Sequence, residues 1–420
     1  MPSIVVMGTP ESASFDVESI RADFPILDRE IGDSQLVYLD NAATSQTPEQ
    51  VVESITDYYR RYNANVHRGL HQLSQEASIA YEEAHDRVAE FIGASGEREE
   101  IVFTKNTTES MNTVAYAWGL EHLGPGDEVV LTEMEHHAAL VTWQQIAKKT
   151  GATVKFVAVD DEGYLDMDHA RELITDDTEM VSVVHVSNTL GTQNPVSELA
   201  DIAHDHDSLI FVDGAQSVPH QPVDVEAIDA DFFAFSGHKM CGPTGVGVLY
   251  GKRHLLDSMQ PYLYGGMMIE KVTFEDSTWH ELPWKFEAGT PPICEGIALA
   301  EACDYLDDIG MERVRRHGER LAAYAHDRLS EFEDIRILGP PGDDRAALVS
   351  FNLDSVHAHD VSEILNANGV AVRAGDHCTQ PLHDKLGVPA SARASFYLYN
   401  TEEEVDVLVD ALDEARELFA

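Results

Sequence analysis

The sequence predicts an α/β fold in which a large domain with a mostly parallel sheet of about seven strands is joined to a smaller α+β domain. Short apolar runs recur from residue 100 to residue 251, and helical patterns separate most of them. This alternation is typical of parallel strands that are covered by helices on both faces. The expected strands are EIVFT, EVVLT, TVKFVAV, MVSVVHV, SLIFVDG, DFFAFSG and VGVLYG.

The pattern changes near residue 297, which is the second observation behind the predicted fold. A long amphipathic helix is expected over residues 311–332, and the strand-like segments ALVSFNL, GVAVRAG and ARASFYLY follow it. We therefore expect the large domain to span residues 35–296. The small α+β domain should combine residues 16–34 with residues 297–420.

Capping residues indicate where several helices begin. Asp16 opens the segment DVESIRADFPIL, which stops at a proline, and residues 1–15 before it are expected to be a loose leader. Thr47 is a candidate cap with Pro48 at the first helical position. Asp360 is expected to cap a short helix in the small domain.

The charge balance is extreme, with 28 Lys and Arg residues against 75 Asp and Glu residues and a net charge of −47. Such a field repels nucleic acid and anionic membranes, so neither is expected as a partner. The hydrophobic fraction of 43% is that of a folded protein, and the acidic residues are scattered along the chain. The composition indicates a protein surface suited to a salt-loaded cytoplasm, and a merely acidic mesophilic protein is the alternative.

The cysteines and histidines do not form a recognisable metal motif. His136 and His137 could be half of a site, but the sequence has no HExxH helix and no nearby ligand cluster, so no metal is expected. Without CxxC spacing, disulfides and structural zinc are not expected either. No signal peptide or membrane-spanning run is present, which predicts a cytoplasmic protein. The four cysteines are Cys241, Cys294, Cys303 and Cys378.

The candidate chemistry is concentrated between residues 211 and 245. Asp213 follows one buried-strand pattern and Lys239 follows the next, so both side chains should face the crevice at the carboxyl ends of a parallel sheet. Enzymes that use pyridoxal phosphate need a lysine that binds the aldehyde and an anion that keeps the pyridine nitrogen protonated. The pair Asp213 and Lys239 therefore predicts a pyridoxal phosphate site.

Hydroxyl groups that could bind the phosphate lie near this pair. Ser236 and His238 flank the lysine segment, and Gly237 would let the backbone pass close to a ring. Thr107 and Thr108 follow the strand EIVFT and open a helix, where helix N–H groups suit a phosphate. N-capping is the alternative role of these threonines, and the two roles are compatible.

Several longer phrases resemble the SUF-type (group II) cysteine desulfurases, which are class V aminotransferases within the fold-type I enzymes that depend on pyridoxal phosphate. The phrases occur in the family's order from about Asp16 to the C-terminus. They are LDNAATSQTP, VHRGLH, TKNTTESMN, EHHAALV, HVSNTLGTQNP, VDGAQSV, SGHKMCGPTGVG, FEAGTPP and RAGDHCTQPL.

The resemblance implies roles for individual residues. It places His136 against the cofactor ring, Asn188 near the phenolic oxygen of the ring, and Thr290 on the phosphate of the neighbouring subunit in a homodimer. His67 and Arg68 become neighbours of the active site by the same resemblance. The implied catalytic residues are Lys239, Cys378 and His136; the implied cofactor ligands are Thr107, Thr108, His136, Asn188, Asp213, Gln216, Ser236, His238, Lys239 and Thr290; the implied substrate ligands are Arg393, Arg373, Asn188 and His67.

Cys378 is expected to be the reactive cysteine. Its surroundings in RAGDHCTQPL are polar, which favours a reactive thiolate over a buried apolar thiol. The implied reaction converts L-cysteine to L-alanine and leaves a persulfide on Cys378. The sulfur acceptor could be a zinc-containing SufU-type carrier, because the resemblance places His359 where an imidazole could replace a zinc ligand of that carrier.

Three other functions stay open from the sequence. Within the same family, the chain could be a selenocysteine lyase or a kynureninase-like enzyme or transaminase, although the RAGDHC motif favours sulfur chemistry. From another class, it could be a non-catalytic nucleotide-binding protein that uses the same crevice. The sequence also leaves open whether the sulfur serves iron–sulfur cluster assembly, tRNA thiolation or both.

Overall fold

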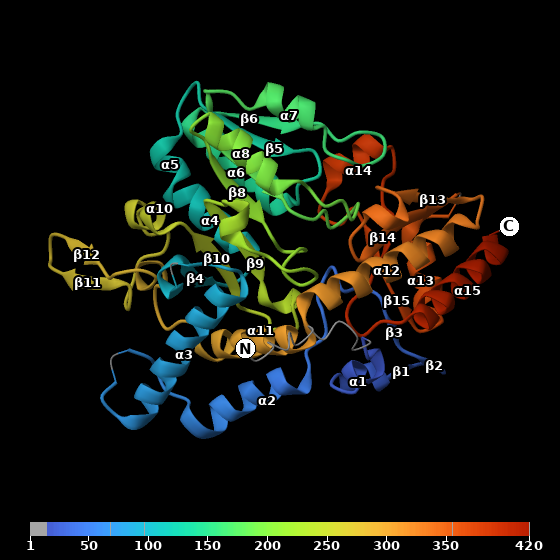
Figure 1. The fold of residues 1–420 in the computed structure, drawn as a ribbon, viewed down its shortest axis with the longest axis horizontal. Helices are drawn as coiled ribbons and strands as arrows, with labels where there is room; N and C mark the ends of the chain where they lie inside the picture. Colours follow the sequence, from blue (N-terminus) through green and yellow to red (C-terminus); the bar gives the residue numbers. More distant parts are fainter. Residues whose placement is uncertain (1–14, 68, 96, 355, 420) are drawn as a thin grey trace, which may run out of the picture.

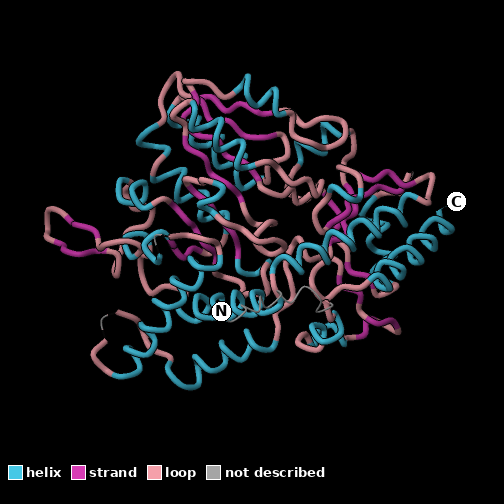
Figure 2. Tube along the Cα trace, viewed as in Figure 1, coloured by secondary structure: helices cyan, strands magenta, loops and turns pink. Residues whose placement is uncertain are grey.

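The computed structural model describes residues 15–67, 69–95, 97–354 and 356–419, so the expected leader lies almost entirely outside the described residues. Figure 1 shows two regions side by side, a large α/β region and a smaller C-terminal region. Figure 2 shows that helices enclose the strands of the large region. This arrangement confirms the predicted α/β fold class.

All seven predicted strands of the large region form one sheet with the order β4-β10-β9-β8-β7-β5-β6. Neighbouring strands from β9 to β6 are parallel, and only β10 runs antiparallel to its two neighbours. The sheet is therefore mostly parallel, as predicted. The strands are β4 (Ile101–Thr104), β5 (Glu128–Thr132), β6 (Thr153–Val157), β7 (Thr178–Val184), β8 (Leu209–Asp213), β9 (Phe232–Ser236) and β10 (Gly247–Gly251).

The two faces of this sheet pack against different sets of helices. Side chains of a strand alternate between faces, and Phe233 and Phe235 belong to one apolar cluster whereas Phe232 and Ala234 belong to another. Both clusters are buried, which explains the continuous apolar character of these strands. The first face is covered by α3 (Gln72–Phe91), α8 (Val196–Asp205) and α11 (Ile293–Ile309), and the second by α4 (Thr107–Ala117) and α6 (His137–Thr150).

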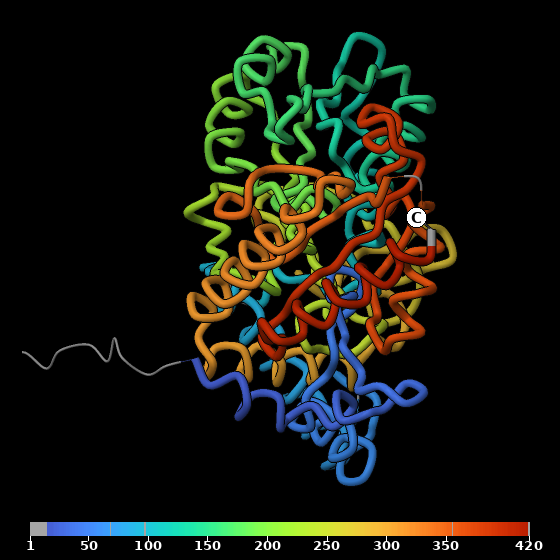
Figure 3. The backbone as a smooth tube through the Cα atoms, turned by 90° about the vertical axis from the view of Figure 1, so that its right-hand side faces the viewer, coloured from blue at the N-terminus to red at the C-terminus, as the bar shows by residue number. Residues whose placement is uncertain are grey.

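The C-terminal region is built on an antiparallel sheet with the order β13-β14-β17-β16. Figure 3 views this region from the right-hand side of Figure 1, with the C-terminal helix α15 toward the viewer. The predicted α+β character is confirmed. The elements are α12 (Met311–Ser330), β13 (Ile335–Leu338), β14 (Leu348–Leu353), α13 (Ala358–Ala367), β15 (Val370–Ala371), β16 (Arg373–Gly375), α14 (Gln380–Leu386), β17 (Ser391–Ser395) and α15 (Glu402–Phe419).

The N-terminal segment contacts the C-terminal region. Strand β3 (Val37–Tyr38) pairs in parallel with β15, and Arg21 at the end of α1 (Val17–Arg21) forms an ion pair of 3.0 Å with Glu404. Helix α11 begins before residue 297 and packs on α3 of the large region. The domain division at residues 35 and 297 stays a prediction, because these elements join the two regions.

Two predicted helix caps are wrong. Helix α2 (Glu49–Asp57) has Pro48, not Thr47, at its N-cap position, and no side chain caps it. Helix α13 is capped by His357, whose Nδ1 accepts a hydrogen bond of 3.2 Å from the N–H of His359, so Asp360 lies in the first turn instead. In both cases the N-cap preferences of the residues do not by themselves determine where the helix begins.

A hairpin that the sequence did not predict extends from the large region. Strands β11 (Ile269–Val272) and β12 (Ser277–Trp279) pair in antiparallel orientation, and Figures 1 and 2 show the hairpin reaching away from the body of the molecule. Phe274 in its turn is fully exposed. Within the part of the chain that the structure describes, no helix is long and apolar enough to cross a membrane.

Candidate active site

A cavity of about 280 Å³ lies where the large sheet meets the C-terminal region. It touches the last residues of three parallel strands, Val184 of β7, Asp213 of β8 and Ser236 of β9, as expected for a crevice at the carboxyl ends of an open sheet. The predicted site residues in its lining are Thr107, Thr108, His136, Asn188, Asp213, Gln216, Ser236, His238, Lys239, Arg373, Cys378 and Arg393.

Asp213 and Lys239 line the cavity from neighbouring strands. Asp213 ends β8 and is buried, and its Oδ1 accepts a hydrogen bond of 2.9 Å from the N–H of Ala215. Burial raises the pKa of Asp213, whereas this hydrogen bond and the charge of Lys239 oppose the rise. Lys239 ends the 3₁₀ turn that follows β9, and burial lowers its pKa to about 8. A substantial share of its amine is therefore neutral near physiological pH.

Hydroxyl groups gather at the start of α4. Thr107 is the first residue of this helix, and its N–H donates to Ser236 Oγ over 2.9 Å while the two hydroxyl oxygens lie 2.7 Å apart. The cap of the helix is Asn106, whose side chain accepts from the N–H of Glu109. The threonines are thus not caps, and the hydroxyl pair of Thr107 and Ser236 lies beside the helix N-terminus, a position that favours anions.

Two further predicted ligands are held by the loop after Asp40. Gln216 Nε2 donates to the carbonyl of Ala42 over 2.7 Å, and His238 Nδ1 lies 3.2 Å from Thr44 Oγ1. The carbonyl of His238 in turn accepts from the N–H of Ser45 over 3.0 Å. The segment NAATS therefore fixes one wall of the cavity.

His136 is the N-cap residue of α6. Its Nδ1 accepts a hydrogen bond of 3.0 Å from the N–H of Ala138, which leaves the rest of the ring on the cavity. Burial and, to a smaller extent, the charge of Lys239 lower the pKa of His136 to about 4. The ring is therefore neutral near pH 7, which suits stacking on an aromatic ligand.

Cys378 lies in the turn between β16 and α14, and its side chain is exposed. His377 and Cys378 both have left-handed backbone conformations, with φ of 48° and 60°. Polar contacts hold this strained turn: the N–H of Cys378 donates to Asp376 Oδ1 over 3.0 Å, and Asn188 Nδ2 donates to the carbonyl of His377 over 2.7 Å. The thiol is thus exposed on a backbone fixed to the cavity wall.

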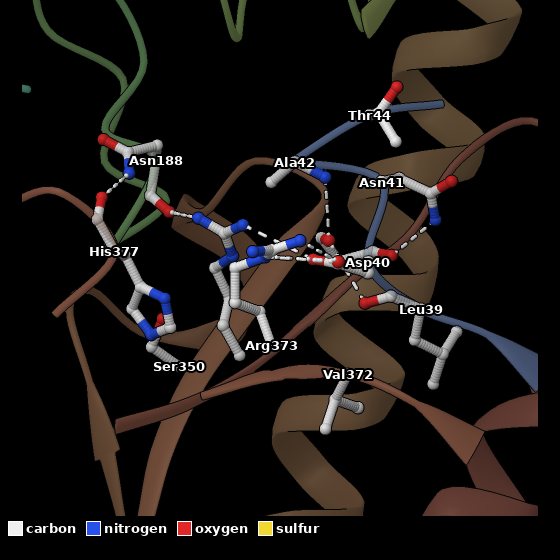
Figure 4. A network of polar contacts seen from close by, with 12 residues as sticks. Leu39, Asp40, Asn41, Ala42, Thr44, Asn188, Ser350, Val372, Arg373 and His377 are labelled. Carbon is white, nitrogen blue, oxygen red and sulfur yellow. Dashed lines mark hydrogen bonds and ion pairs between the residues drawn. The ribbon is translucent and has the colours of Figure 1, made fainter. Parts of the chain in front are cut away.

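Two arginines and an aspartate form a charged group at the cavity (Figure 4). Arg373 donates to Asp40 over 2.6 Å, and Arg393 lies 3.7 Å from the same carboxylate. Nη1 of Arg393 donates to the carbonyl of Asn188 over 2.8 Å. Burial lowers the pKa of Arg393, and this effect outweighs the attraction of Asp40, so that the pKa is about 10. The cation is buried between its two partners.

The single chain does not bring two predicted residues into the cavity. His67 lines a separate cavity of about 120 Å³ with Trp284, and Thr290 lines another of about 370 Å³ with Lys105. Arg68 lies outside the described residues. Thr290 was expected to serve the neighbouring subunit, so its position is compatible with that prediction.

Sequence reasoning missed three residues that shape the site. Asp40 and Asn106 were given no role, and His137 was interpreted only as part of an incomplete metal motif. The sequence carried a signal for Asn106, because asparagine is a preferred cap immediately before a helix. Asp40 and His137 act on residues more than two hundred positions away, which no local pattern reveals.

The cavity fits pyridoxal phosphate by its own chemistry. It offers a hydroxyl pair at a helix N-terminus, a buried carboxylate and a partly buried lysine. Arg393 Nε is a buried donor that has no hydrogen-bond partner within the described chain. Such atoms are costly in a folded protein unless a bound molecule pairs with them. The donor set therefore matches an anionic, aromatic cofactor and a carboxylate substrate.

The fold and the cavity together define a fold-type I α/β enzyme with an exposed cysteine beside the lysine. Residues 37–408 match the family described as aminotransferase class-V. The chain belongs to the class-V aminotransferase family, which confirms at this level the resemblance of the motifs.

Curated relatives match the chain over nearly its whole length. It is 74% identical over 426 residues to the cysteine desulfurase of Haloferax volcanii, which covers 99% of this chain and 100% of the relative. It is 69% identical over 415 residues to the probable cysteine desulfurase of Halobacterium salinarum, with coverage of 99% and 100%. These similarities agree with the salt-adapted surface that the composition indicated.

Solved structures give the same result for the fold. The apo cysteine desulfurase of Thermococcus onnurineus NA1 superposes with a TM-score of 0.90 at 43% identity, covering 95% of this chain and 98% of that one. The Escherichia coli cysteine desulfurase CsdA, in an S-sulfonic acid form, has a TM-score of 0.90 at 39% identity, with coverage of 97% and 100%.

Proposed function

We propose that the chain is a cysteine desulfurase that depends on pyridoxal phosphate. It removes the sulfur of L-cysteine, releases L-alanine and holds the sulfur as a persulfide on Cys378. The observation that carries the proposal is the composition of one cavity, in which Lys239, Asp213 and the exposed Cys378 line the same space. Family membership and the names of the curated relatives support it.

The residues of the cavity divide into those that bind the phosphate and those that hold the ring. When bound, pyridoxal phosphate withdraws electrons from the α-carbon of an amino acid. His136 would pack on the ring, and Asp213 would keep the ring nitrogen protonated. The phosphate ligands are Thr107, Thr108, Gln216, Ser236 and His238.

Lys239 would hold the cofactor through Nζ and would move the α-proton of the substrate. Its lowered pKa of about 8 suits Nζ to act as a base. Arg393 holds the substrate carboxylate with its free edge, and Asn188 orients that arginine through its carbonyl.

Cys378 takes the sulfur atom. The thiolate of Cys378 attacks the sulfur of L-cysteine, an S–S bond forms, and the Cβ–S bond of the substrate breaks. The electron pair of that bond stays with the substrate carbon, which takes up a proton and becomes the methyl group of L-alanine. The overall reaction is balanced, since the thiol of Cys378 and one L-cysteine yield one persulfide and one L-alanine.

The proposal includes a homodimer. Thr290 reaches the phosphate of the partner subunit, and His67 contacts the substrate there. The two cavities that hold these residues share Glu287 and Pro291, so they form one continuous region of the surface. The fully exposed Phe274 on the nearby hairpin supports a partner that covers this region.

The proposal also includes SUF-type membership and a zinc-containing SufU-type sulfur acceptor. His359 is exposed in the first turn of α13, a helix that packs on β16 just before the Cys378 turn. An exposed imidazole can replace a cysteine on the zinc of a docked carrier and free that thiolate to attack the persulfide. Transfer of sulfur to such a carrier by wild type and by His359→Ala tests this part.

The test of the function uses L-cysteine and the loaded protein. We expect equal amounts of alanine and protein-bound sulfane sulfur in the first turnover, and we expect sulfur on Cys378 by mass spectrometry. Borohydride should fix the cofactor on Lys239 and remove the yellow colour. A loaded protein that forms no alanine from L-cysteine would overturn the proposal.

A further inference from the structure

Asp40 contacts the two arginines of the cavity unequally. Arg373 Nη2 donates to Asp40 Oδ2 over 2.6 Å, and Arg373 Nε lies 3.1 and 3.2 Å from the two carboxylate oxygens. Arg393 Nη2 lies 3.7 Å from Asp40 Oδ1, which is too long for a hydrogen bond. The carboxylate is therefore paired with Arg373, and only a longer-range attraction links it to Arg393.

Arg393 keeps an edge without a partner. Its side chain is 3% exposed, against 50% for Arg373, and its Nε is buried with no hydrogen-bond partner within the described chain. A guanidinium in this state is a receptor for a carboxylate, which accepts two parallel hydrogen bonds from it. Arg373 also lines the cavity, but the edge of its guanidinium that could bind a second carboxylate is already bound to Asp40.

The backbone around Asp40 is fixed, so the carboxylate cannot easily move away. Asp40 bridges in parallel to Ser395, the N–H of Ala42 donates to Ser395 Oγ over 2.9 Å, and Asn41 Nδ2 donates to the carbonyl of Ser395 over 2.6 Å. Ser395 belongs to the same strand as Arg393. Figure 4 shows the guanidinium of Arg373 directed at the carboxylate of Asp40.

We propose that Asp40 is a specificity-determining residue. By neutralising Arg373 it leaves one guanidinium for the ligand, and it thereby selects amino acids with a single carboxylate over those with a second acidic group. The charges support this, because two guanidiniums and one carboxylate sum to one positive charge, which a single carboxylate balances. Without Asp40, two cations would face the cavity and favour a dianion. The inference rests on the proposed function, in which Arg393 binds the substrate carboxylate.

The test compares the binding of two probes, propionate and succinate, to the loaded enzyme by isothermal titration calorimetry at constant KCl. In Asp40→Asn, we expect the ratio of succinate affinity to propionate affinity to rise by about tenfold. In Asp40→Glu, which keeps the charge, the ratio should stay within about twofold of wild type. Asp376→Asn is the matched control, because it removes a nearby carboxylate that contacts the N–H of Cys378 and neither arginine.

Two outcomes would overturn the inference. One is an unchanged ratio in Asp40→Asn, and the other is an equal rise in Asp376→Asn, which would show a general effect of charge. Alanine formation by wild type is measured in parallel. If alanine forms and the ratio does not change, the role of Asp40 fails and the proposed function stands; if no alanine forms, the function fails, and the ratio still reports on Asp40.

A second variant removes the other partner of the ion pair between Asp40 and Arg373. In Arg373→Gln, Asp40 loses its partner, and its whole charge then acts on Arg393, whose Nη2 lies 3.7 Å away, so propionate should bind about tenfold more weakly. The double variant Asp40→Asn/Arg373→Gln removes one charge of each sign and should restore propionate binding to near the wild-type value. If propionate binds equally weakly to Arg373→Gln and to the double variant, the proposed role of Asp40 is contradicted. This comparison also serves as the test if Asp40→Asn alone does not fold.

Discussion

The carbonyl of Cys378 accepts a hydrogen bond of 2.8 Å from the N–H of His137. The ring of His137 makes a second contact with the same turn, since its Nε2 accepts a hydrogen bond of 3.0 Å from the N–H of Gln380. The start of α6 therefore holds the cysteine turn at two points, the carbonyl of Cys378 and the N–H of Gln380. His136, the neighbouring residue, faces the cavity, so one short segment connects the ring-binding wall to the sulfur-accepting turn.

Removal of the His137 ring should loosen the cysteine turn. His137→Ala deletes the acceptor for Gln380, and one such hydrogen bond is worth about 1 kcal/mol. We therefore expect alanine formation to fall by about fivefold, the factor that corresponds to this energy, whereas binding of pyridoxal phosphate, measured by absorbance titration, stays unchanged. His137→Gln offers an amide oxygen in place of the ring nitrogen and should lose less. Equal losses of cofactor binding and of turnover would contradict a role confined to the turn.

Attachment of the cofactor to Lys239 should depend on pH. Burial lowers the pKa of this amine to about 8, and only the neutral amine attacks an aldehyde. The neutral form predominates above that pKa, so the attachment rate should rise with pH and level off above about pH 8. The attachment rate is measured by stopped-flow absorbance after the cofactor-free protein is mixed with pyridoxal phosphate. If the midpoint of the rate against pH lies near the ordinary lysine pKa, the effect of burial is refuted. Lys239→Ala is the control without attachment.

Cys378 should be the one cysteine that reacts in the folded protein. Its side chain is exposed, whereas Cys241, Cys294 and Cys303 are buried, and burial raises the pKa of Cys241 to about 12. Iodoacetamide should modify one thiol per chain, and alanine formation should fall in proportion. Cys378→Ser should bind the cofactor normally and form no alanine from L-cysteine. Normal turnover by this variant would exclude Cys378 as the sulfur acceptor.

The sequence predicted the elements of the fold better than the contacts between them. Strands such as β8 and β9 are apolar throughout because both of their faces are buried, and that pattern is visible locally. The polar residues at their ends, Asp213 and Lys239, could be placed for the same reason. The hairpin β11–β12 was missed, since its residues are mostly exposed and carry no alternating pattern. Asp40 was missed because its partner Arg373 is 333 residues away.

Arg393 should not tolerate lysine. Burial lowers the pKa of the guanidinium to about 10, and a lysine starts from an ordinary pKa about two units lower, so an amine in this place would be neutral in a larger fraction of the molecules. It would also lack the planar fork that binds a carboxylate at two points. We expect the KM for L-cysteine to rise by about tenfold or more in Arg393→Lys. Arg373→Lys keeps its ion pair with Asp40 and should change KM less; similar increases in both variants would argue against a special role for Arg393.

Concentrated salt should stabilise the fold, because the net charge of −47 makes the compact chain repel itself. Many of the basic residues are already paired, for example Arg98 with Glu82 and Asp86, so most of the remaining acidic surface has only solution cations to neutralise it. The screening length falls from about 10 Å at 0.1 M salt to about 3 Å at 1 M. The Tm from differential scanning calorimetry should therefore rise by about 10 °C or more between 0.1 M and 2 M KCl, which for a chain of this size corresponds to several kcal/mol in the free energy of unfolding.

Sucrose at equal osmolality is the control, because it is excluded from the protein surface but does not screen charge. If sucrose raises the Tm as much as KCl does, the effect comes from exclusion and the electrostatic explanation is wrong.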